Sequence, residues 1–386
     1  MTERWYETDS YTTEFDAAVV KAQPCDGGTE VTLNGTYFFP AEGGQSPDRG
    51  TLNGFPVTDV QIRDGEIIHT VSGNVQAGET AHGAVDWDFR FRNMQMHSGE
   101  HIFSGLVFRL YGLANVGFHL SENSATMDFN GILTPEDVSR VEHLVNQVIV
   151  ENHAIRAWYP SEEELATLPY RSKKELTGPI RLVEIEGVDL CACCVPHVRS
   201  TGEIGFIKIV SRENYKGGTR LHYLGGFRAL DHYEESLKIL SKAGQSLSVT
   251  REKIVPAVEK LLDDNRSLSY RLVEAERAAV AGKIRDICRE GEPASIVLFL
   301  PGDGNVLRYA VDTAEQYCKG TCAFFAGDDE GGYRYLIECP GGSVADIQKA
   351  LRAELGAKGG GPVQSVSGRV DASEEAIRSL LERAGI

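Results

Sequence analysis

Two short clusters of histidine and cysteine contain the residue types that bind metal ions. His97 and His101 are four residues apart, so in a helix both rings lie on one face. Farther along the chain, Cys193 and Cys194 are followed closely by His197, and a thiolate and an imidazole at this spacing can reach one ion. Imidazole and thiolate together suit zinc. We therefore expect one Zn²⁺ ion per chain.

Spacing alone does not decide which sulfur binds the ion. Cys191, Cys193 and Cys194 all lie just before His197. The alternative is that the cysteines are small buried side chains of the hydrophobic core. Three cysteines and a histidine so close together would pack a hydrophobic core poorly. Eight cysteines among 386 residues are too few for a disulfide scaffold, which again favours metal binding or catalysis.

Two glycine-containing segments could bring the backbone close to a ligand. In the first, Gln45 follows Glu42 and two glycines and offers both a donor and an acceptor. In the second, Lys358 precedes three glycines without the spacing of a nucleotide-binding P-loop. A basic residue beside glycines could contact a nucleic-acid backbone. Taken alone, each segment is also compatible with an ordinary surface turn.

The net charge of −17 argues against broad, nonspecific binding of nucleic acid. The stretch 199–228 is richer in bases, and it mixes them with aromatic rings. Bases for phosphate and rings for stacking suit a single-stranded 3′ end, although a strand hairpin with a solvated basic face explains the pattern equally well. The candidate contacts are Arg212, Lys216, Arg220, Tyr223 and Arg228.

The elements that position these residues follow from the hydrophobic pattern. Short alternating runs over residues 10–90, separated by turn residues, predict a small β-barrel. The period then changes, which predicts a helix over 92–112 that carries both histidines and a second helix over 135–153. Strands near 125–129, 180–186, 204–210 and 220–227 complete an α+β domain, with the cysteines in the loop after 180–186.

The remaining chain predicts a helical linker and a further domain. An apolar heptad seam runs from Ile254 to Ala279 and includes Asn265. It fits an intrachain hairpin with 231–247 or a dimeric coiled coil equally well. Two apolar strands and two helices over 292–386 predict an α/β domain. No run of 18 apolar residues and no signal peptide are visible, so we expect a cytoplasmic protein with no membrane segment.

The motifs, in this order, resemble those of the AlaX-type alanyl-tRNA editing proteins, which look like alanyl-tRNA synthetases without the aminoacylation half. The matching segments are residues 37–45 with Asp48 and Gly50, residues 94–101, and residues 193–205. The resemblance covers residues 1–230 well and the rest more loosely. It implies that the zinc ligands are His97, His101, Cys193 and His197. Where the family usually has three glycines before the glutamine, this chain has Glu42 in the first place.

The resemblance also implies an activity and a partner. Family members hydrolyse the ester of wrongly attached serine, or glycine, at the 3′ end of tRNA(Ala). Thr36 matches a threonine associated with sensing the serine hydroxyl, and we expect Gln45 near it. Glu100 is a weaker candidate for a general base. The C-terminal domain would hold the tRNA body, with Lys358 as a contact, and it or the linker could form a homodimer.

We therefore expect an α+β protein in four parts: a β-barrel with the glycine-rich motif (1–90), a zinc-binding editing domain (91–230), a helical linker (231–291) and a C-terminal α/β domain (292–386). Two other functions remain open. Four protein ligands resemble a closed structural zinc site, which would suit a non-catalytic tRNA-binding adaptor. The order His97-x-x-Glu100-His101 matches inverzincin metallopeptidases, a reading that needs a downstream acidic ligand and gives Cys193 and His197 no role.

Overall fold

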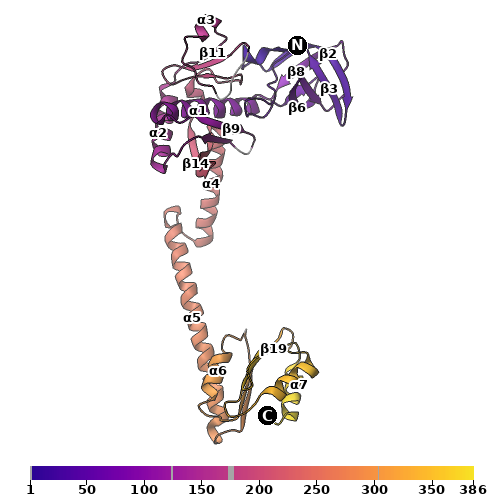
Figure 1. Ribbon diagram of the computed structural model, residues 1–386, viewed down its shortest axis with the longest axis vertical. Coiled ribbons are helices and arrows are strands. Elements are labelled where there is room, and N and C mark those ends of the chain that lie inside the picture. The colour runs from indigo at the N-terminus through magenta and orange to yellow at the C-terminus, as the bar shows by residue number, and fades with distance from the viewer. Residues whose placement is uncertain (1, 123–124, 173–177, 303) are drawn as a thin grey trace. The chain divides into compact units, whose positions relative to one another are not determined.

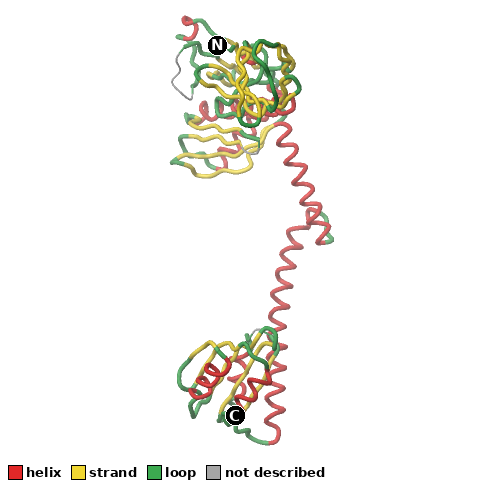
Figure 2. Tube along the Cα trace, turned by 90° about the vertical axis from the view of Figure 1, so that its right-hand side faces the viewer, coloured by secondary structure: helices red, strands yellow, loops and turns green. Residues whose placement is uncertain are grey.

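The structure is a computed structural model that describes residues 2–122, 125–172, 178–302 and 304–386 (Figure 1). The chain divides into two compact units, Met1–Leu240 and Ser241–Ile386. Strands and helices mix in both units, so the predicted α+β class is confirmed (Figure 2). The finer division into four parts stays a prediction. Among the described residues, no helix is both long and apolar enough to cross a membrane.

Unit 1 begins with a closed barrel whose strands follow the order β2-β3-β7-β6-β5-β8. Alternate residues of β2, including Phe15, Ala17 and Val19, point into the core, which is the period-two pattern of a half-buried strand. A short parallel pair, β1 (Glu3–Arg4) with β4 (Gly35–Thr36), lies beside the 3-10 helix Trp5–Glu7. The barrel strands are β2 (Glu14–Cys25), β3 (Gly28–Leu33), β5 (Gly50–Leu52), β6 (Phe55–Arg63), β7 (Glu66–Val71) and β8 (Thr80–Val85).

The helix α1 (Trp87–Tyr111) follows the barrel and is buried along most of its length. Asp86 caps its N-terminus by accepting a hydrogen bond from the Phe89 N–H, so the helix begins earlier than the predicted residue 92. It packs with α2 (Pro135–Glu151), which starts with a capping box between Thr134 and Asp137. Beside them lies a sheet in the order β14-β15-β10-β9, made of β9 (Asn115–Leu120), β10 (Ala125–Phe129), β14 (Ile207–Tyr215) and β15 (Gly218–Gly225).

A third sheet leads to the cysteine cluster. It contains β11 (Ile155–Trp158), β12 (Leu182–Ile185) and β13 (Asp189–Ala192), with the short helix α3 (Glu162–Leu165) between the first two. The cysteine loop follows β13 directly and ends in the 3-10 helix Thr201–Ile204. The helix α4 (Gly226–Leu247) then leaves the sheet after β15.

Unit 2 has its own five-stranded sheet in the order β16-β17-β18-β20-β19, in which only β16 and β17 run parallel. Apolar residues of α5 and α6 pack on one face, and those of α7 and α8 on the other. The strands are β16 (Ser295–Leu300), β17 (Thr321–Asp328), β18 (Gly332–Glu338), β19 (Lys358–Gly360) and β20 (Ser365–Val370). The helices are α5 (Ile254–Ile287), α6 (Leu307–Ala314), α7 (Ala345–Leu355) and α8 (Glu374–Arg383), with 3-10 turns at Arg251–Lys253 and Cys288–Glu290.

The structure corrects one prediction about unit 2 and leaves another open. The segment from Lys358, for which an ordinary turn was one of the two expectations, forms the edge strand β19. Its Gly359 pairs so closely with β20 that a Cβ would lie 2.2 Å from the Ser367 carbonyl oxygen, so the pairing needs glycine at this position. The seam residues of α5 are exposed, with Leu268 at 59% and Leu272 at 61%. Hairpin and coiled coil therefore both stay predictions.

Candidate metal centre and its cavity

The side chains of His97, His101, Cys193 and His197, here called the metal group, come together from α1 and from the loop after β13. One donor atom from each lies within 4.8 Å of the others. The Cys193 Sγ is 3.5 Å from the His97 Nε2 and 3.4 Å from the His197 Nε2. Ligands roughly 2.0–2.3 Å from a tetrahedral zinc ion are about 3.5 Å from one another, so the residues fit this ion. Neither Cys191 nor Cys194 belongs to the metal group.

Each histidine of the metal group has an acceptor behind its ring. Because that acceptor faces Nδ1, the ring proton is held there and Nε2 is left bare for a metal ion. This is the tautomer that a ligand needs. The three Nδ1 contacts are His97 with the Gln45 Oε1 at 3.2 Å, His101 with the Asp189 Oδ2 at 3.3 Å, and His197 with the Ser98 Oγ at 2.9 Å.

Asp189 is itself held by a second charged group. The Arg171 guanidinium donates to both of its oxygens, from Nε at 2.7 Å and from Nη2 at 2.8 Å. Burial opposes ionisation of Asp189, but the nearby His101 ring and the hydrogen bonds from Arg171 outweigh it and lower the pKa of the carboxyl. The His101 ring thus faces a fixed carboxylate.

The electrostatics of the metal group favour ligand forms for three of its members. Burial raises the pKa of the Cys193 thiol, but His97 and His197 outweigh it and bring that pKa well below its ordinary value. Burial lowers the pKa of His197 to about 3 and also lowers the pKa of His97. His101 differs, because Asp189 and Cys193 overcome burial and raise its pKa to about 9.

The cysteine loop is fixed by contacts from distant parts of unit 1. Arg181 donates from Nη1 to the carbonyl oxygens of Cys193 at 2.9 Å and Val195 at 3.1 Å. Ser10, near the N-terminus, donates to the His197 carbonyl oxygen at 2.9 Å. The loop therefore has few ways to move its two ligands away from α1.

The turn of residues 42–45, here called the glycine turn, brings Gln45 to the metal group. It closes with a hydrogen bond from the Gln45 N–H to the Glu42 carbonyl oxygen at 3.0 Å, and φ is +61° at Gly43 and +79° at Gly44. A Cβ on Gly44 would lie 2.3 Å from the Phe118 carbonyl oxygen on β9. Only glycine fits where the turn packs against this strand.

A buried ion pair ties the segment after the glycine turn to α1. Arg90 and Asp48 are each 1% exposed, and the Arg90 Nε donates to the Asp48 Oδ2 at 3.0 Å. The same oxygen accepts the Phe39 N–H at 2.7 Å. The helix that carries two ligands and the segment that carries Gln45 are thus joined independently of a metal.

Thr36 lies in the barrel core and is fully buried. Its Oγ1 is 2.9 Å from the His69 Nε2 and accepts the Phe38 N–H at 3.0 Å. The His69 Nδ1 faces the Val31 carbonyl oxygen at 3.1 Å, which can only accept, so the Thr36 hydroxyl donates to Nε2. The structure therefore brings Gln45 to the metal group but leaves Thr36 beside His69. The expected proximity of Gln45 to Thr36 stays a prediction.

Glu100 is also buried, at 1% exposure. Its Oε1 accepts hydrogen bonds from the Ser104 Oγ at 2.5 Å and from the Asn115 Nδ2 at 2.6 Å. These contacts give no support to a general-base role. The metal group includes Cys193 and His197, for which the metallopeptidase alternative has no place.

A cavity of about 610 Å³ opens beside the metal group. His97, His101 and Cys193 line it together with the glycine turn and Phe118. Four ionic side chains also line it: Arg4, Glu7, Glu42 and Arg181. Sequence reasoning missed Arg4, Glu7 and Arg181, because segments so far apart in the chain meet only through the tertiary fold.

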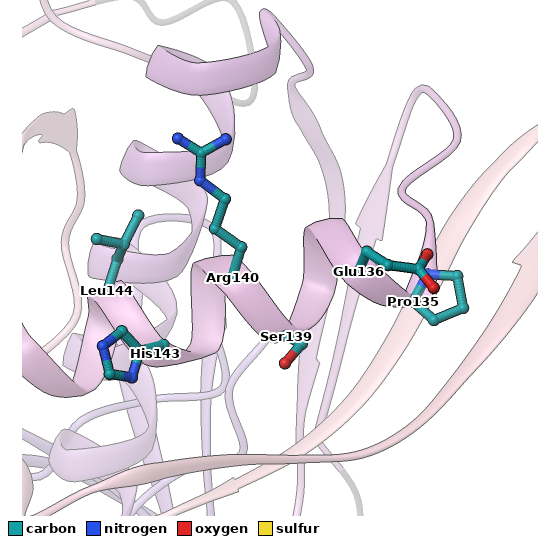
Figure 3. A pocket seen from close by; sticks show the side chains of 6 residues that line it. All are labelled: Pro135, Glu136, Ser139, Arg140, His143 and Leu144. Atoms are coloured by element: carbon teal, nitrogen blue, oxygen red, sulfur yellow. The ribbon is translucent and has the colours of Figure 1, made fainter.

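A second hollow, of about 840 Å³, lies along the outer side of α2 (Figure 3). It is lined by Pro135, Glu136, Ser139, Arg140, His143 and Leu144. None of these belongs to the metal group or the predicted RNA contacts.

The residues predicted to contact RNA differ in how exposed they are and in whether they already bind other groups of the protein. Tyr223 is 1% exposed and donates to the Met96 carbonyl oxygen at 3.0 Å, so its ring is part of the core and has no free face for a base. Arg220 forms a bidentate pair with Asp128, at 2.7 Å for both hydrogen bonds. Arg212 and Arg228 donate to the backbone carbonyl oxygens of Leu133 and Ser121, respectively. Lys216 and Lys358 are exposed.

The sheet beside the metal group places the protein in a known class. Residues 180–222 match the family model described as the threonyl and alanyl tRNA synthetase second additional domain. The fold and the site therefore define a protein that carries this accessory domain of the tRNA synthetases.

Similarity over nearly the whole chain gives the family. The chain is 30% identical to the alanyl-tRNA editing protein AlaX-L of Pyrococcus horikoshii, over 98% of this chain and 96% of that protein. It is 27% identical to the alanyl-tRNA editing protein Aarsd1 of Danio rerio, over 98% and 95%. An alanine–tRNA ligase of Ignicoccus hospitalis is 28% identical over 99% of this chain but only 42% of the ligase. The chain belongs to the AlaX-type alanyl-tRNA editing proteins.

Proposed function

We propose that the protein is a deacylase that hydrolyses the ester joining serine, and secondarily glycine, to the 3′ end of tRNA(Ala). One observation carries the proposal: three of the four residues of the metal group, His97, His101 and Cys193, line an open cavity. A cavity of about 610 Å³ has the size of a small-molecule site. It would hold the terminal aminoacyl-adenosine. The names of the relatives support this activity.

The residues of the metal group fit zinc, held by three Nε2 atoms and one Sγ. When bound there, zinc would supply a Lewis acid that polarises the ester carbonyl. The chain itself holds the rings through Gln45, Ser98 and Asp189, and it holds the cysteine loop through Arg181. This preorganisation means that little rearrangement is needed when the ester enters.

The preference for serine follows from the limits of size selection. A synthetase site made for alanine cannot exclude glycine and rejects serine by roughly a hundredfold at best. An editing site must therefore recognise the hydroxyl. Thr36 stays our candidate sensor: because its proton is donated to His69 and one lone pair accepts the Phe38 N–H, its Oγ1 would offer the second lone pair to a serine hydroxyl that donates.

We further propose that unit 2 binds the body of tRNA(Ala). Lys358 on the edge strand β19 is an exposed cation suited to phosphate, and Lys216 in the β14–β15 turn offers a similar exposed cation on unit 1. The exposed seam of α5 supports a homodimer.

The test is deacylation of Ser-tRNA(Ala), Gly-tRNA(Ala) and Ala-tRNA(Ala) by the native protein and by Cys193→Ala, with zinc measured in both. We expect rapid loss of serine, slower loss of glycine, stable alanine, and no activity in the variant. Stable serine esters with fully zinc-loaded native protein would favour the adaptor with a structural zinc, a function that four protein ligands would also suit.

A further inference from the structure

Glu42 stands where the family usually has a glycine, and it lines the cavity beside the metal group. Glu42 and Gln45 pair as an antiparallel bridge across the turn. Side chains that are directly opposite in such a pair lie on the same face, with Cβ atoms about 5 Å apart. Gln45 contacts His97, and Glu42 lines the same cavity as His97, His101 and Cys193.

Among the four ionic side chains of the cavity, Glu42 is the most weakly held, because its neighbours are the Cys194 thiol, which is a weak donor, and the more distant Arg4. Glu7 accepts from the Arg4 Nη1 at 3.3 Å and from the Tyr159 hydroxyl at 2.5 Å. Arg181 donates to backbone carbonyl oxygens. The Glu42 Oε2 is buried without a hydrogen bond, and the Arg4 Nη1 lies 3.7 Å away.

The Glu42 side chain is 36% exposed, but its Oε2 is buried, and a buried carboxylate oxygen without a hydrogen bond is unfavourable until a ligand supplies a donor. The cavity therefore offers a site for a hydrogen-bond donor, and a cationic donor suits a carboxylate best. In an aminoacyl ester, the α-ammonium is such a group, and it lies one carbon from the carbonyl that the metal group would face. The phosphates of the tRNA are anions, so the Glu42 carboxylate repels them and they are not the expected ligand.

We propose that Glu42 binds the α-ammonium of the aminoacyl ester. This inference rests on the proposed deacylase function and deepens it, because it defines the substrate class as esters with a free α-amino group. Esters whose amino group is acylated, as in every peptidyl-tRNA, lack this cation and bind poorly. The glutamate thus distinguishes a mischarged tRNA from a tRNA that carries a growing peptide.

The test combines two proteins with two ligands. The proteins are the zinc-loaded full chain and its Glu42→Gln variant, which has the same shape without the charge. The ligands are the non-hydrolysable 3′-amide analogue of seryl-adenosine, with its amino group free, and the same analogue with that group acetylated. We expect the native protein to bind the free amine about 10- to 100-fold more tightly, as for a charge-assisted hydrogen bond.

In Glu42→Gln this preference should disappear while affinity for the acetylated analogue stays the same. The matched control is Glu122→Gln, which removes an exposed carboxylate paired with Arg49 and should leave the preference intact. Zinc content and melting temperature verify that each variant is folded.

An undiminished preference in Glu42→Gln would overturn the inference. An equal loss for both ligands would also overturn it, since it would assign Glu42 to a ribose hydroxyl or to the position of Arg4. So would a native protein that binds neither analogue. Failure of the deacylase function looks different: the free-amine preference would depend on Glu42, yet Ser-tRNA(Ala) would not be hydrolysed.

Discussion

Asp189 connects the His101 ring to the Arg171 guanidinium. A carboxylate behind a ligating imidazole fixes the ring and increases its basicity. We expect Asp189→Asn to lower zinc affinity about 10- to 100-fold, the usual effect of losing such a partner. Competition with a chelator of known affinity measures this change.

The matched control for Asp189→Asn is Asp128→Asn, because Asp128 also pairs with an arginine but lies outside the metal group. It should retain native zinc affinity. Equal affinity in both variants would show that the Asp189 contact does not support the metal group.

His69 makes the stability of the barrel depend on pH. Burial lowers its pKa to about 4, whereas an unfolded histidine titrates near 6.5. Between these values the unfolded chain binds the additional proton, so the free energy of unfolding falls as the pH falls. From pH 7.5 to pH 5, the contribution of His69 should fall by roughly 2 kcal/mol.

His69→Gln retains a donor and an acceptor without titrating, and it should show a shallower dependence on pH. Urea unfolding followed by tryptophan fluorescence measures this, since Trp5, Trp87 and Trp158 all lie in unit 1. Parallel pH profiles for the two proteins would contradict the assignment.

At the scale of single residues, the sequence predicted the metal ligands better than it predicted the side chains that contact those ligands. Four-residue spacing predicted the histidine pair, and the cysteine cluster predicted the thiolate. The acceptors behind the rings could not be predicted, because they depend on ring orientation across separate elements. Gln45 was expected near Thr36, which stays a prediction, whereas the contact of its amide oxygen with His97 was not foreseen.

The buried pair of Arg90 and Asp48 determines how the glycine turn is held against α1. Arg90→Met would leave a carboxylate buried without its counter-charge, which typically costs about 3–5 kcal/mol. We expect a loss of this size in the free energy of unfolding. Arg49→Met, which breaks an exposed pair with Glu122, should cost at most about 1 kcal/mol. Similar losses in both variants would argue against this role.

The elements themselves were largely predictable from period and caps, since α2 begins at the predicted residue 135. The basic stretch was the weaker prediction. Along β15, successive residues point to opposite faces, so Arg220 and Tyr223 cannot share one surface. Basic and aromatic residues that alternate along the sequence are therefore not side by side in the structure. Only the face of β15 that carries Arg220 is exposed to solvent.

The boundary between the two units offers a test of the whole molecule. A chain that ends at Leu240 retains the metal group, the cavity and the glycine turn, because all of them lie in unit 1. If unit 2 holds the tRNA body, this truncation should raise KM for Ser-tRNA(Ala) at least tenfold and change kcat little. Steady-state deacylation of both proteins measures this. An unchanged KM would remove the tRNA role proposed for unit 2.

The metal group takes two ligands from residues 97–101 and two from residues 193–197, which has a consequence for biosynthesis. The ribosome makes the chain from its N-terminus, so the histidines of α1 emerge long before their partners. No nascent chain shorter than 197 residues can hold the ion with all four ligands. Unit 2, however, contributes none of them. The ion can therefore be captured during translation, while unit 2 is still being made.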